Sequence, residues 1–126
     1  MLAEILIITN NPMVNNINNA EICFVKGDNR QVFYEVLNKV ATGHKLITHP
    51  LAGNIKPEDN PYRSVAVSKS KAKADLAILA KLNQYLDKIE ANQMKRKVNL
   101  PSIMTDFQLI DKDLIENAIQ NYHKGR

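Results

Sequence analysis

The sequence predicts an α/β fold, a three-layer sandwich around a small, mostly parallel sheet of four or five strands. Short apolar segments rich in β-branched residues alternate with segments whose apolar residues recur at helical spacing. Strands that alternate with helices favour a sheet covered on both faces, and such sheets are usually parallel. With 126 residues, of which 44% are hydrophobic, the chain suits a single domain over residues 1–126.

Four segments are expected to form the strands. The first covers residues 3–9, is rich in isoleucine and stops at an Asn-Asn-Pro turn. The second covers residues 21–26 and stops at a glycine. Two short strands follow, at residues 45–48 and 64–68, and the three prolines between them exclude regular structure there.

Three helices complete the prediction. Asp28 is a suitable N-cap for the first, whose apolar residues recur at helical spacing until Gly43 ends it. A leucine stripe predicts a long helix over residues 70–97, which offers a surface for a homodimer. Residues 98–110 are expected to be irregular, with an added edge strand as one option, and Asp111 is expected to cap the last helix.

Polar residues follow each of the four predicted strands. In an open α/β sheet, ligands bind beyond the carboxyl ends of the strands, so parallel strands would bring these residues to one edge. The alternative is that each is an ordinary turn residue. Candidate ligand-binding residues, taken from these strand ends and from the loop described next, are Asn10, Asn11, His49, Gly53, Lys56, Tyr62, Arg63, Ser68 and Lys69.

The loop over residues 49–63 is the most informative stretch for function. Structureless connections of this length are uncommon in compact domains and are more often functional than short turns. Gly53 permits a close backbone approach, while Lys56 and Arg63 supply hydrogen-bond donors. A lid over a small anion is one interpretation, and a rigid loop with Tyr62 packed against the sheet is the other.

Composition and motifs exclude several classes of protein. The net charge is +4, and the Lys69–Lys73 run lacks interleaved aromatic residues, so nucleic-acid binding is not favoured. Cys23 is the single cysteine and cannot form an internal disulfide, which points to a reducing cytoplasm. No segment is apolar and long enough for a membrane span. No motif for a metal, a nucleotide cofactor or a serine nucleophile is present, so we expect no cofactor and no metal.

Three segments resemble the GrdX family, small proteins encoded with the glycine, sarcosine and betaine reductase systems. They are ITNNP at residues 8–12, GHKLITHPLAGNIKP at 43–57 and PYRSVAVS at 61–68. The resemblance extends over nearly the whole chain and is weakest in the last thirty or so residues. It implies a cytoplasmic accessory protein of anaerobic amino-acid reduction, and it supplies no catalytic residues.

Two functional hypotheses follow from the sequence. In the first, the protein is an accessory that binds a small anionic metabolite, or a protein of the reductase system, at the carboxyl ends of the strands. In the second, it is a small enzyme of amino-acid metabolism with His49 as its acid or base. The residues leave open whether any reaction is catalysed.

Overall fold

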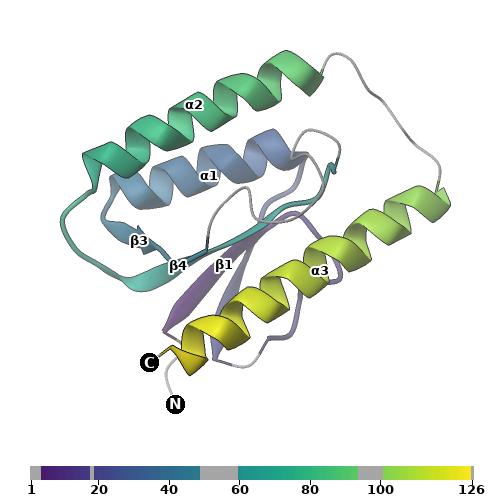
Figure 1. The fold of residues 1–126 in the computed structure, drawn as a ribbon, viewed down its shortest axis with the longest axis horizontal. Coiled ribbons are helices and arrows are strands. Elements are labelled where there is room, and N and C mark those ends of the chain that lie inside the picture. Colours follow the sequence, from purple (N-terminus) through teal and green to yellow (C-terminus); the bar gives the residue numbers. More distant parts are fainter. Residues whose placement is uncertain (1–3, 18, 49–59, 94–100, 126) are drawn as a thin grey trace.

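The computed structural model describes residues 4–17, 19–48, 60–93 and 101–125 (Figure 1). Four strands and three helices follow one another along the chain. In sequence order they are β1 (Ile5–Thr9), β2 (Ala20–Phe24), α1 (Asn29–Ala41), β3 (His44–Leu46), β4 (Ser64–Lys71), α2 (Leu76–Gln93) and α3 (Pro101–Lys124). No helix in this described part of the chain combines the length and the apolar character needed to cross a membrane.

The strands form a single sheet in the order β2-β1-β4-β3. β1 and β2 are parallel, whereas β4 is antiparallel to both of its neighbours, β1 and β3. The predicted α/β class is therefore confirmed, with four strands, but the prediction of a mostly parallel sheet is wrong. β4 enters the sheet between β1 and β3 in the reverse direction, so β1, β2 and β3 end at the edge where β4 begins.

α1 covers one face of the sheet and α2 packs on α1 (Figure 1). Because side chains alternate along a strand, Ile8 of β1 and its register partner Val65 of β4 point to this face. Both are fully buried beside Val36 of α1 and Leu82 of α2. The predicted first helix is confirmed, and Asp28 is its N-cap, accepting hydrogen bonds from the backbone amides of Arg30 and Gln31.

α3 covers the opposite face (Figure 1). Ile7 and its register partner Ala66 point to this side of the sheet, where they join a buried cluster with Ile115 and Ile119 of α3. Thr9 and Ser64 are also register partners, two residues further along the same alternation. The polar end of the sheet on this face therefore lies against α3.

Two predicted helix boundaries are wrong. The long helix expected over residues 70–97 begins only at Leu76, because β4 continues to Lys71 and Asp75 caps the helix through the amides of Ala77 and Ile78. The last helix begins at Pro101 rather than after Asp111. Proline suits the first helical position because its missing N–H would have no intrahelical partner there.

Candidate functional site

Buried polar side chains gather where β1 ends and β4 begins. We call this region the polar edge. It is made of Thr9, Asn10, Asn11, Asn29, Asn60, Arg63, Ser64 and Asp111, all of them buried. Polar groups at such depth are costly to desolvate unless they are hydrogen-bonded. Their concentration at one end of the sheet makes this the candidate functional site.

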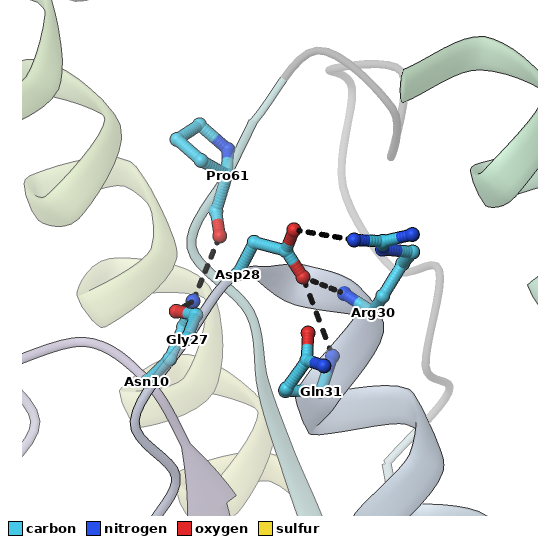
Figure 2. A network of polar contacts seen from close by, with 6 residues as sticks. All are labelled: Asn10, Gly27, Asp28, Arg30, Gln31 and Pro61. Carbon is cyan, nitrogen blue, oxygen red and sulfur yellow. Dashed lines mark hydrogen bonds and ion pairs between the residues drawn. The ribbon is translucent and has the colours of Figure 1, made fainter. Parts of the chain in front are cut away.

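Asn10 joins three chain segments at the polar edge (Figure 2). Its side-chain amide donates to the carbonyl of Gly27 at 3.0 Å and to that of Pro61 at 2.8 Å. Its Oδ1 accepts from the backbone amide of Arg63 at 2.9 Å. Three of the side chain's four hydrogen-bonding positions are thus occupied by backbone, so Asn10 holds the edge together rather than presenting a free amide.

Asn11 performs the same task on the α3 side. Its amide donates to the carbonyl of Gln108 at 2.8 Å and to Oδ2 of Asp111 at 3.1 Å. Its Oδ1 accepts from the backbone amide of Met13 at 3.0 Å. Asn11 therefore ties the end of β1 to the middle of α3.

Asn60 connects the same edge to two helices. Its carbonyl accepts from Nδ2 of Asn29, the first residue of α1, at 3.0 Å. Its own amide donates to the carbonyl of Phe107 in α3 at 3.3 Å, and its Oδ1 accepts from the backbone amide of Tyr62. The short segment before β4 is consequently fixed by hydrogen bonds to β1, α1 and α3.

A directional chain of hydrogen bonds ends on the carboxyl group of Asp111. The Ser64 hydroxyl donates to Oδ2 of Asp111 at 2.6 Å, which uses its single proton. The 2.7 Å contact between Thr9 and Ser64 must then have the Thr9 hydroxyl as its donor. Thr9 in turn accepts from the backbone amide of Asn11 at 3.0 Å. All of these donors point toward Asp111.

Burial raises the pKa of Asp111 above its ordinary value of 3.8, because a carboxylate loses its hydration inside the protein. The hydrogen bonds from Ser64 and Asn11 and the charge of Arg63 act in the opposite direction. Desolvation is the largest of these effects, so Asp111 is a buried acid whose ionised form is held by three partners.

Arg30 carries a buried donor at the other side of the edge. Its guanidinium lies 3.5 Å from Oδ2 of Asp28, and the two side chains are 41% and 38% exposed (Figure 2). The Nε–H of Arg30, however, is buried and has no hydrogen-bond partner among the described residues. Buried donors are usually hydrogen-bonded, and this one lies in the first turn of α1, where the helix dipole favours negative charge.

The predicted candidate residues fall into three groups. The structure brings Asn10, Asn11, Tyr62 and Arg63 together at the polar edge. His49, Gly53 and Lys56 lie outside the described residues, as does most of the loop 49–63.

Ser68 and Lys69 lie at the opposite end of the sheet. Ser68 is the register partner of Ile5 at the start of β1, and the Lys69 amide donates to the carbonyl of Glu4. The prediction of one edge shared by all four strand ends is therefore wrong for these two residues, because β4 is antiparallel.

Thr9, Ser64 and Asp111 are not among the site residues predicted from the sequence. Asp111 follows a proline-containing stretch and precedes an apolar stripe, which is also the pattern of an N-cap. The signal in the sequence was its spacing, four residues before Ile115 and eight before Ile119, which places the three side chains on one face of a helix. Ser64 and Thr9 carried no signal until β1 and β4 were known to pair.

A family comparison identifies the chain. The model of the GrdX-like protein family matches residues 6–120. The chain belongs to the GrdX-like protein family. The match includes β1 through most of α3 and therefore every residue of the polar edge. No curated protein and no solved structure is significantly similar to the chain. Within the described residues, no group of three His, Cys, Asp or Glu side chains could hold a metal ion.

Proposed function

We propose that this GrdX-like protein is a cytoplasmic accessory protein of the glycine, sarcosine and betaine reductase system that binds a small anion beside the polar edge, at Arg30 in the first turn of α1. The observation that carries the proposal is the buried Nε–H of Arg30, which has no acceptor among the described residues. A carboxylate or phosphate oxygen would supply that acceptor.

The surroundings of Arg30 support an anion in two ways. The residue lies in the first turn of α1, where the helix dipole places partial positive charge. Arg63, the residue directly before β4, is a second, buried guanidinium at this edge, and its charge also lowers the pKa of Asp111. Asp28 provides the only negative charge that the described residues bring into direct contact with Arg30, and it lies at 3.5 Å, longer than a strong ion pair.

Asn10, Asn11 and Asn60 act as positioning residues in this proposal. Their amides are engaged with backbone and with Asp111, so they fix the shape of the edge, and Arg30 is the residue that contacts the ligand. An accessory role is favoured over catalysis because Asp111, the acid at the edge with a raised pKa, is buried beneath Ser64 and Asn11.

The test is isothermal titration calorimetry with acetate, inorganic phosphate, glycine and betaine. We expect one or more of them to bind to the wild type and Arg30→Gln to weaken that binding about tenfold or more. Lys112→Gln, on α3, is the matched control and should bind normally. Equal binding by the wild type and Arg30→Gln would contradict the proposal.

A protein of the reductase system that presents a carboxylate could satisfy the same donor. Co-purification of such a protein with the wild type but not with Arg30→Gln, in the absence of small-anion binding, would assign the edge to that partner instead. A homodimer through the long helix stays a separate prediction, which native mass spectrometry tests directly.

A further inference from the structure

A pocket of about 320 Å³ opens at the end of the sheet opposite to the polar edge. It lies on the face that α1 covers, near the C-terminal half of that helix. Its lining residues come from all four strands and from α1; they are Leu6, Glu21, Ile22, Cys23, Lys39, His44 and Lys69. We call it the lysine-lined pocket.

The inner part of the lysine-lined pocket is apolar. Leu6 and Cys23 are partly buried and pack against the core cluster beneath α1. Burial raises the pKa of the Cys23 thiol above 9.0, so the sulfur is uncharged at neutral pH and behaves as a small hydrophobic group. An aliphatic part of a ligand would therefore contact this surface favourably.

The rim of the pocket carries both signs of charge. Lys69 and Glu21 form an ion pair with a separation of 2.5 Å, and both side chains are about half exposed. Lys39 lies 3.6 Å from Glu35, one turn earlier in α1, and contributes the second ammonium group. Exposed pairs of this kind are weak, so a ligand can exchange with either partner at little cost.

His44 completes the rim with a ring whose Nδ1 is hydrogen-bonded to the backbone. Its Nδ1 lies 2.7 Å from the carbonyl oxygen of Ser68, which can only accept, so Nδ1 carries the proton. Nε2 is then the ring nitrogen left for a polar group of a ligand.

We infer that the lysine-lined pocket binds a small amino-acid zwitterion with an aliphatic side chain. The carboxylate contacts Lys39 and Lys69, the ammonium contacts Glu21, and the side chain lies against Leu6 and Cys23. A ligand with a carboxylate but no ammonium would place its negative charge beside Glu21, which is repulsive. A ligand with an ammonium but no carboxylate would place its positive charge beside Lys39 and Lys69. The site is separate from the polar edge and does not depend on the function proposed there.

The test compares three probes of one shape by titration. L-Leucine carries both charges, 4-methylpentanoate lacks the ammonium, and 3-methylbutylamine lacks the carboxylate. We expect leucine to bind about tenfold more tightly than either of the others. The rate at which iodoacetamide alkylates Cys23 is also measured with and without each probe. Cys23 is the single cysteine in the chain, and a ligand in the pocket should slow its modification.

Variants assign the two charges of the ligand to their partners. Glu21→Gln should weaken leucine about tenfold and leave 4-methylpentanoate unchanged, whereas Lys39→Gln should weaken both to a similar extent. Asp113→Asn and Lys124→Gln, on the α3 side of the sheet, are the matched controls and should change nothing. Arg30→Gln should also leave leucine binding intact, which separates this site from the polar edge.

Three outcomes would overturn the inference. They are no binding of leucine at about 10 mM, equal binding of leucine and 4-methylpentanoate, or leucine binding that leaves the alkylation rate of Cys23 unchanged. Tight binding of leucine with protection of Cys23 and sensitivity to both Glu21→Gln and Lys39→Gln would establish it.

Discussion

The hydroxyl of Ser64 lies 2.6 Å from Oδ2 of Asp111, although the two residues are 47 positions apart in the chain. This contact joins the first residue of β4 to the middle of α3 and ends a chain of donors that begins at the backbone of Asn11. The docking of α3 on the sheet therefore combines an apolar cluster with one buried acid, and that acid makes the docking sensitive to pH.

The first prediction concerns the pH dependence of stability. Because burial raises the pKa of Asp111 in the folded protein, the folded state holds this proton more tightly than the unfolded state. The stabilisation is complete below the ordinary pKa of 3.8 and is lost as the pH rises through the raised folded value. It amounts to about 1.4 kcal/mol for each pH unit between the two pKa values.

Urea unfolding from pH 4 to pH 7, monitored by circular dichroism, measures this effect. Asp111→Asn should show a smaller decrease in the free energy of unfolding over that interval than the wild type, because asparagine does not titrate. Asp113→Asn, two residues further along α3 and exposed, should follow the wild type. Parallel curves for the wild type and Asp111→Asn would mean that Asp111 has no perturbed titration.

A second prediction concerns truncation of the same acid. Asp111→Ala removes the acceptor for Ser64 and Asn11 and leaves two buried donors unsatisfied. The free energy of unfolding should fall by about 2–4 kcal/mol. Ser64→Ala removes the hydrogen bond donated to Asp111 and the one accepted from Thr9, but it leaves the contact between Asn11 and Asp111 in place, and should cost about 1–2 kcal/mol. If Asp111→Ala were the milder of the two variants, the acid would not be the centre of the network.

The polar edge as a whole depends on Asn10, which gives a third prediction. Asn10→Asp preserves size but places a carboxylate oxygen where the amide now donates to the carbonyls of Gly27 and Pro61. We expect a loss of about 3 kcal/mol in the free energy of unfolding, since two hydrogen bonds become repulsive contacts. Asn83→Asp, on the exposed face of α2, is the control and should change stability little.

Amide hydrogen exchange would locate the effect of Asn10→Asp. The backbone amide of Arg63 donates to Oδ1 of Asn10, and that of Val25 donates to the carbonyl of Thr9. Exchange should accelerate at Arg63 first, because the carbonyl of Pro61, two residues earlier, loses the hydrogen bond that joins this segment to Asn10. Uniform acceleration over the whole sheet would indicate global destabilisation rather than local release of the edge.

Local sequence signals predicted those parts of the fold that depend on neighbouring residues. The apolar runs located β1 and β4, and Asp28 marked the start of α1, because strand alternation and helix capping are determined within a few residues. The direction of β4 was not predictable in this way. The three prolines between Thr48 and Arg63 predict no helix that would favour a parallel crossover, so the sequence left the direction of β4 open, and β4 runs antiparallel between β1 and β3.

The same dependence on long-range strand pairing decides which of the candidate site residues lie together. Asn10 and Asn11 lie at this edge in either arrangement of β4 because β1 ends there, whereas Arg63 precedes β4 and is brought to the same edge only by the reversal of that strand. Ser68 and Lys69 moved to the other end with the reversal of that strand. Asp111 needed knowledge of which face of α3 meets the sheet, a long-range property that no turn or cap signal contains.

The last prediction concerns Gly43, where α1 leads into β3. Its φ is +108°, and a Cβ at this position would lie 2.1 Å from the carbonyl oxygen of Ala72. Its own carbonyl accepts from the Ala72 amide at 2.8 Å, so neither backbone segment can move away without losing that bond. Gly43→Ala should therefore lower the free energy of unfolding by about 3 kcal/mol or more.

Gly125→Ala is the control. A Cβ at Gly125 would lie at an ordinary 3.6 Å from the nearest atom beyond the neighbouring residues, so stability should not change. Thermal unfolding of the two variants, measured side by side, tests this prediction. Equal midpoints would show that the junction of α1 and β3 tolerates a side chain. The contact between Gly43 and Ala72 would then not fix the end of β4 beside His44.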